Sequence, residues 1–197
     1  MRSRRLPLLV LAVLPIYAQD ASLQPLAKTL ASLRIQNADA EVPSRPIADL
    51  TTAKHQLRDW IEAQLPPPEQ TNNVETLADT LNSRLRAIAK PANDKGNLFG
   101  DLSDVHLEQD NSYLTVTAGV GIVCHYDESA YVYRNESGRW TRIFADEQTD
   151  YSPDHYSPQH ISGVYLHRSR VGNDDANTVF VMTLGNRAGC QSLWHGI

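Results

Sequence analysis

The histidines of this chain gather in its second half, where imidazole groups could bind a metal ion or transfer protons. Six of the seven follow residue 100, in a region that also holds many carboxylates. Zinc in hydrolytic enzymes binds imidazole and carboxylate groups and keeps one position open for water. No two histidines show the HxH or HExxH spacing that places both on one ion. The weak metal candidates are His125, His155 and His160, and we expect no confident metal site and no cofactor.

Two adjacent acids, Asp127 and Glu128, could supply a general acid and a general base, or oxygen ligands for calcium. Neighbouring residues of a β-strand point to opposite faces, so a strand would not aim both at one site. We interpret the pair as part of a polar turn between strands. A ligand surface in this region would draw on the acids and histidines around that turn. Its candidates are Asp127, Glu128, Glu147, Asp150, His155 and His160.

Cys124 and Cys190 are the only cysteines. In an oxidising compartment a single pair is typical of a disulfide, and closing a loop of this length would stabilise the fold by roughly 4 kcal/mol. Strand alternation places Cys124 on the apolar face of residues 120–126, which favours a buried bridge. A catalytic thiol is the alternative, but no activating arrangement can be read around either cysteine.

The first 18 residues have the features of a secretory signal peptide. Three arginines precede an apolar run over residues 6–17, and Ala18 follows. That run is shorter than the roughly 20 residues that span a bilayer. We expect cleavage after Ala18, no transmembrane segment thereafter, and a secreted or periplasmic protein. Retention as an uncleaved anchor is the alternative.

The net charge of −5 comes mainly from the second half of the chain. Residues 101–197 contain 13 acidic residues, 6 arginines and no lysine. A region this acidic repels phosphate backbones, so we expect no nucleic acid partner. A protein or a small ligand is the expected partner.

Helical periodicity dominates the residues before 100. Apolar residues recur at helical spacing over 22–35, more clearly over 49–65, and again from Asn73 to Ile88. In the segment 49–65, Lys54 belongs to the polar side. Three prolines from Pro66 end that helix, and the short connection predicts an antiparallel helical hairpin that leans on a sheet.

From residue 101 the apolar period changes to 2, which predicts β-strands. Residues 135–138 predict a tight hairpin turn, and the run 179–182 is apolar on both faces, which favours a central strand. Near the C-terminus, Leu193 and Trp194 look like the start of another buried strand. We therefore expect an open sheet edge that a partner or missing C-terminal sequence completes. The expected strands cover 105–108, 113–118, 120–126, 130–134, 139–144, 161–166 and 178–184.

These patterns predict an α+β protein in three parts. Residues 1–18 are the signal peptide, 19–100 a helical region with a linker, and 101–197 an antiparallel β domain with an incomplete C-terminal edge. The expected architecture is an N-terminal helical hairpin followed by an antiparallel β-meander or open sandwich of about six to eight strands.

Two functional hypotheses follow. The sequence has no Gly-x-Ser-x-Gly elbow, phosphate loop or dinucleotide-binding glycine pattern. We therefore favour a non-catalytic exported binding or interaction module with an aromatic, acidic sheet surface. Its contact candidates are Tyr126, Tyr131, Tyr133, Trp140, Tyr151 and Tyr156. The alternative is a metal-dependent hydrolase that uses His125, Asp127, Glu147 and His155.

Overall fold

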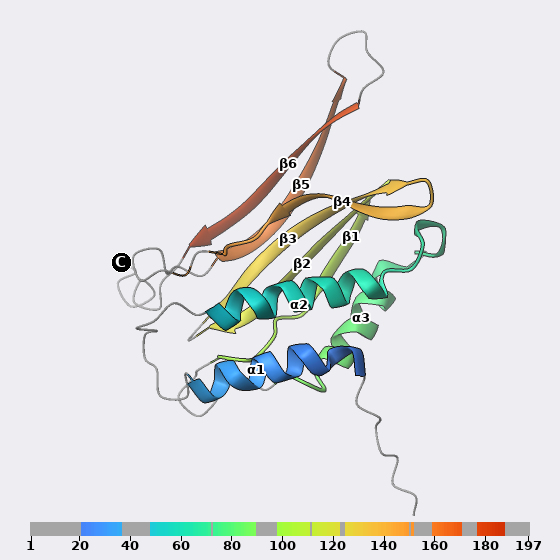
Figure 1. Ribbon diagram of the computed structural model, residues 1–197. Coiled ribbons are helices and arrows are strands. Elements are labelled where there is room, and N and C mark those ends of the chain that lie inside the picture. Colours follow the sequence, from blue (N-terminus) through green and yellow to red (C-terminus); the bar gives the residue numbers. More distant parts are fainter. Residues whose placement is uncertain are drawn as a thin grey trace, which may run out of the picture.

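The computed structural model describes residues 21–36, 48–71, 73–89, 98–110, 112–122, 125–149, 151, 159–170 and 177–187. In these residues the chain forms three α-helices and two antiparallel sheets, which confirms the α+β class (Figure 1). The signal segment, Cys124 and Cys190 lie outside the described residues, as do Asp150 and His155. No helix in the described part has the length and apolar character needed to cross a membrane.

The three helices are α1 (Gln24–Gln36), α2 (Ala48–Gln64) and α3 (Val74–Leu85). The side chain of Asn73 accepts a hydrogen bond from the backbone N–H of Thr76, so it caps α3. Helix α2 packs against α1 and the sheet, whereas α3 packs against the first strand. These contacts do not confirm the expected hairpin of α2 with α3. The polyproline segment and the short 3₁₀ turn Pro68–Gln70 separate the two helices.

The first sheet is a four-stranded meander of β1 (His106–Asp110), β2 (Tyr113–Ile122), β3 (His125–Glu136) and β4 (Arg139–Asp146). The described residues hold two further strands, β5 (Gln159–Arg170) and β6 (Asn177–Arg187), which pair only with each other. A single sheet or sandwich of six to eight strands is therefore not confirmed.

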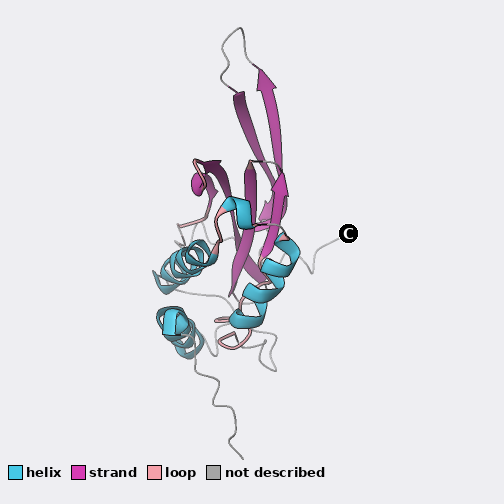
Figure 2. Cartoon of the chain, turned by 90° about the vertical axis from the view of Figure 1, so that its right-hand side faces the viewer, coloured by secondary structure: helices cyan, strands magenta, loops and turns pink. Residues whose placement is uncertain are grey.

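Strand alternation gives the meander two unlike faces. Leu114, Val116 and Val120 of β2 are fully buried on the face that the helices cover (Figure 2). Tyr131 and Tyr133 of β3 join them, because they pair in register with Val116 and Leu114. The opposite, outer face carries Thr115, Thr117 and Glu128, and β5 lies near it. The core thus sits between the meander and the helices.

The interpretation of Asp127 and Glu128 as a turn is wrong. Strand β3 begins at His125, and Glu128 pairs in register with Gly119 of β2. Strand β2 runs without a break to Ile122, because Gly119 and Gly121 leave room for neighbouring groups at this end of the strand. The two acids are therefore strand residues.

The hairpin turn between β3 and β4 follows the sequence prediction. Ser137 and Gly138 have φ angles of 53° and 81°, the left-handed conformation that a two-residue hairpin turn requires. The side chain of Asn135 accepts a hydrogen bond from the N–H of Gly138 at 3.1 Å.

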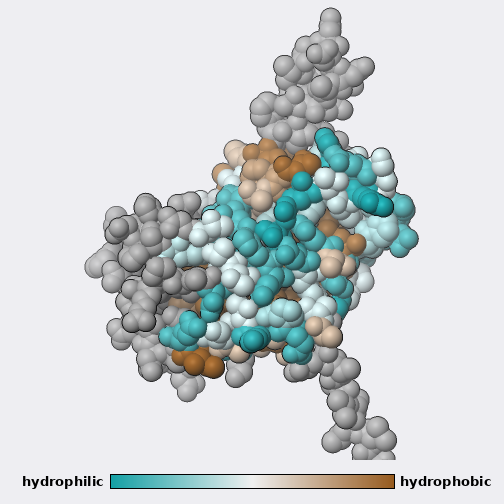
Figure 3. Space-filling view, viewed as in Figure 1, coloured by the Kyte–Doolittle hydropathy of each residue, from teal (hydrophilic) through white to brown (hydrophobic). Residues whose placement is uncertain are grey.

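Strands β5 and β6 form a two-stranded ribbon that extends beyond the meander (Figure 1). The prediction of a central strand at 179–182 is wrong, because β6 has one strand neighbour and Met182 is 54% exposed. Figure 3 shows apolar side chains gathered on the described part of this ribbon, where Leu184 and Tyr165 are also exposed.

Candidate functional site

A buried ion pair joins the helices to the sheet. The ammonium group of Lys54 on α2 lies 2.8 Å from the Asp127 carboxylate, and the two side chains are 2% and 0% exposed. Lys54 also donates to the carbonyl of Gln148 and to the hydroxyl of Tyr151, both at 3.1 Å. The expectation that Lys54 belongs to a solvated helix face is therefore wrong.

The carboxylate of Asp127 accepts three hydrogen bonds. Oδ2 accepts from Lys54 and from the Tyr151 hydroxyl, and Oδ1 accepts from the backbone N–H of Gln159 at 2.8 Å. A buried charge needs such partners, because leaving it unpaired costs several kcal/mol. The cluster ties α2, β3, the segment after β4 and the start of β5 together. Since no solvent reaches Asp127, its role in this arrangement is structural.

Glu147 is held in a similar way by Arg58, which lies one helical turn after Lys54 on α2. Its carboxylate accepts from the Tyr131 hydroxyl at 2.8 Å and from Arg58 at 3.3 Å, and Nε2 of His55 lies 3.3 Å from it. Burial raises the pKa of Tyr131, and the charge of Glu147 raises it further, so the phenol stays protonated and donates. Asp127 thus pairs with Lys54 and Glu147 with Arg58, so the two acids belong to separate sites.

Glu128 points to the outer face of the meander, as strand alternation predicts for the neighbour of Asp127. Its Oε2 accepts from the backbone N–H of Ile161 at 2.8 Å, and Nδ1 of His160 lies 2.9 Å from the same oxygen. Of the candidate ligand surface, the structure therefore brings Glu128 and His160 together. Glu128 is 15% exposed and His160 is 57% exposed, so a ligand can reach both.

The Glu128–His160 pair lines a cleft of about 450 Å³ between the outer face of the meander and β5, which we call the outer cleft. Strands β1, β2, β3 and β5 all contribute to it. Its residues are His106, Glu108, Thr115, Thr117, Glu128, His160, Ile161, Ser162, Gly163 and Val164.

Four polar residues of the outer cleft were missed at the sequence level. His106 pairs in register with Thr117, and Glu108 with Thr115, so all four share one face. The sequence did carry a signal, since His106-x-Glu108 and Thr115-x-Thr117 each alternate at a period of two. What the sequence could not show was the arrival of β5 over that face.

The metal candidates are not brought to one place. His125 shares the face of Asp127 by strand alternation, whereas His160 lies on the outer side with Glu128. Within the described residues, no three His, Cys, Asp or Glu side chains lie close enough to hold a metal ion. Nε2 of His125 is buried and has no hydrogen-bond partner there.

The aromatic contact surface expected from the sequence is mostly core. Tyr131, Tyr133 and Tyr151 are 2%, 2% and 5% exposed, and each hydroxyl donates to a carboxylate. Tyr126 is partly buried, and its hydroxyl donates to Asp101 at 2.7 Å. These tyrosines fail as ligand contacts because their hydroxyls are held by acidic partners within the protein. Tyr156 lies outside the described residues.

Searches against protein-family models, curated proteins and solved structures found no match to this chain. Any functional conclusion therefore depends on the geometry of its own residues.

Proposed function

We propose that this protein is a non-catalytic binding module that takes a small polar ligand in the outer cleft. The observation that carries the proposal is the exposed, polar lining of this cleft. Four strands contribute to the lining, and it includes the Glu128–His160 pair. The hydrogen bond from the Ile161 N–H and the close contact with His160 hold the carboxylate of Glu128 in position before any ligand binds.

The charge of the cleft indicates the class of ligand. Glu108 and His106 are exposed on β1, and their side chains make no hydrogen bond or ion pair within the described residues. The cleft lining contains two carboxylates and no lysine or arginine. Carboxylates and hydroxyls bind amino and hydroxyl groups, and a cation gains most from an uncompensated carboxylate. The ligand class is thus a small molecule with an amino group and hydroxyl groups.

Glucosamine, glucose and gluconate test this proposal, since all three carry several hydroxyl groups and their charges are positive, zero and negative. We expect glucosamine to shift the backbone amide resonances of β1 and the start of β5 in NMR titrations, glucose to do so more weakly, and gluconate not at all. Glu108→Gln should remove the preference for the amine by about tenfold. Glu75→Gln on the exposed side of α3 is the matched control. Equal binding of gluconate, or shifts confined to other strands, would contradict the proposal.

The metal-dependent hydrolase is less well supported. It would need the carboxylates of Asp127 and Glu147, which Lys54 and Arg58 already hold. Stoichiometric zinc or calcium in the purified protein would favour it again.

Export and the disulfide remain part of the proposal. A signal peptide before residue 19 and a bridge between Cys124 and Cys190 would place the binding module outside the cytoplasm. Mass spectrometry of the unreduced secreted protein tests both, because cleavage after Ala18 and the loss of two hydrogens each change the mass.

A further inference from the structure

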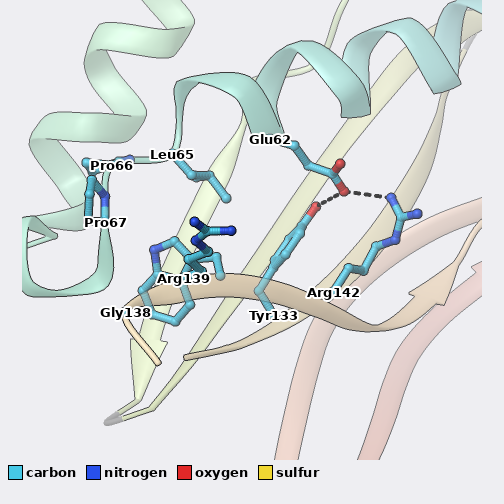
Figure 4. Close-up of a pocket in the computed structure, with 9 residues that line it drawn as sticks. Glu62, Leu65, Pro66, Pro67, Tyr133, Gly138, Arg139 and Arg142 are labelled. Atoms are coloured by element: carbon cyan, nitrogen blue, oxygen red, sulfur yellow. Dashed lines mark hydrogen bonds and ion pairs between the residues drawn. The ribbon is translucent and has the colours of Figure 1, made fainter. Parts of the chain in front are cut away.

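A second pocket, of about 320 Å³, lies between the C-terminal end of α2 and the β3–β4 hairpin; we call it the hairpin pocket (Figure 4). It shares no residue with the outer cleft, so the inference below does not depend on the proposed function. Its lining consists of Glu62, Leu65, Pro66, Pro67, Tyr133, Gly138, Arg139, Trp140 and Arg142.

One wall of the hairpin pocket is electrically balanced. Oε1 of Glu62 accepts from the Tyr133 hydroxyl at 3.0 Å and from Arg142 at 2.6 Å, as the dashed lines in Figure 4 show. Burial raises the pKa of Tyr133, and the charge of Glu62 adds to the effect, so the phenol remains a donor. The charges of Glu62 and Arg142 offset each other.

Arg139 gives the lining of the hairpin pocket a net positive charge. Within the described residues the side chain of Arg139 forms no hydrogen bond or ion pair. Figure 4 shows its guanidinium extending from the hairpin toward Leu65. A guanidinium presents several N–H donors in a plane that matches the oxygens of a carboxylate or sulfonate. In a protein with a net charge of −5, this lining is a local site for an anion.

The remaining walls are apolar and stiff. Leu65, Pro66, Pro67 and Trp140 supply them. Proline fixes its own φ angle, and the two-residue turn at Ser137–Gly138 sets the direction of the hairpin. A pocket built from such elements loses little conformational entropy when a ligand binds. The indole N–H of Trp140, which lies in this wall, is buried without an acceptor in the described part of the chain.

We propose that the hairpin pocket binds amphipathic anions: small molecules with a flat apolar body and one carboxylate or sulfonate group. The apolar body lies against Pro67 and Trp140, and the anionic group accepts hydrogen bonds from Arg139. This ligand class is opposite in charge to that of the outer cleft.

The test uses 1-anilinonaphthalene-8-sulfonate as the anionic probe and N-phenyl-1-naphthylamine as its uncharged analogue. Arg139 is exposed, so Arg139→Gln should fold normally. We expect this variant to bind the sulfonate about tenfold more weakly and the uncharged probe with little change. Arg134→Gln is the matched control, because Arg134 lies on the same hairpin but pairs with Glu136 outside the pocket. Equal losses in the two variants would overturn the proposal.

A second readout excludes binding at the exposed apolar side chains of the β5–β6 ribbon. In NMR spectra the sulfonate should shift the indole N–H resonance of Trp140, which a Trp140→Phe variant identifies. The indole of Trp60 already donates to Ser22 at 3.0 Å and should stay in place. A Trp140 resonance that does not move at saturating probe would overturn the proposal.

Discussion

At the scale of single residues, the centre of this molecule is the buried charge pair of Lys54 and Asp127. Sequence periodicity assigned Lys54 to solvent, because a lysine on the polar side of an amphipathic helix is ordinarily solvated. The assignment failed because Asp127, 73 residues away, comes under α2 only once the meander has formed. Neither the apolar periodicity around Lys54 nor the spacing of nearby charges can show a contact between residues so far apart in the sequence. The outward direction of Glu128 was missed with it, because the two acids were interpreted as a turn and not as neighbouring residues of a strand.

Asp127→Asn tests the structural role of this pair. The variant leaves the Lys54 ammonium buried without a carboxylate, and breaking a buried pair from one side costs about 3–5 kcal/mol. We expect a loss of that size in the free energy of unfolding, measured by urea denaturation. Asp104→Asn is the control, since the ion pair of Asp104 with Arg86 is exposed and worth about 0–1 kcal/mol. Similar losses in both variants would contradict a structural role for Asp127.

At the scale of elements, the predictions succeeded where local chemistry decides the outcome. The polyproline stop after α2 and the 135–138 turn each depend on residues a few positions apart. The strand at 179–182 was assigned correctly as a strand, but its place in the sheet was wrong. An apolar run cannot distinguish a strand covered by protein on both sides from one that leaves an apolar face exposed.

Gly121 shows how one position sets the packing of an element. Its N–H donates to Asp101 at 2.9 Å, and a Cβ there would lie 2.1 Å from the carbonyl oxygen of Leu98. We expect Gly121→Ala to destabilise the fold by about 1–3 kcal/mol, because backbone must move to admit the methyl group. Thermal unfolding measures the change.

Gly163→Ala is the comparison for that substitution. A Cβ at Gly163 would meet the side chain of Tyr165, which is 52% exposed and can rotate away. The loss should stay below about 1 kcal/mol. A loss as large as that of Gly121→Ala would show that the close approach of Leu98 is not what makes Gly121 sensitive.

At the scale of the whole molecule, buried phenols link stability to alkaline pH. Burial raises the pKa of both Tyr131 and Tyr133, and the charges of Glu147 and Glu62 add to it. The folded state therefore keeps these protons above about pH 10, where the unfolded chain loses them. This contribution is complete below about pH 10 and is lost as the pH rises toward the folded-state pKa, by up to about 1.4 kcal/mol per pH unit for each phenol.

The double variant Tyr131→Phe/Tyr133→Phe tests that linkage. Its free energy of unfolding should fall less steeply between pH 10 and 11.5 than that of the parent chain, whatever its absolute stability. Denaturant titrations at several pH values measure the slopes. Equal slopes would mean that the two phenols do not contribute.

The attachment of the β5–β6 ribbon has a consequence for how the molecule opens. Between the ribbon and the meander, the contacts in the described residues include no backbone ladder; Asp127 and Glu128 instead accept from the N–H groups of Gln159 and Ile161. A ribbon held by a few side chains can separate as its own cooperative unit while the four-stranded sheet stays folded. We therefore expect a ligand in the outer cleft, which contacts both the meander and the ribbon, to favour the closed arrangement and to protect the ribbon from proteolysis.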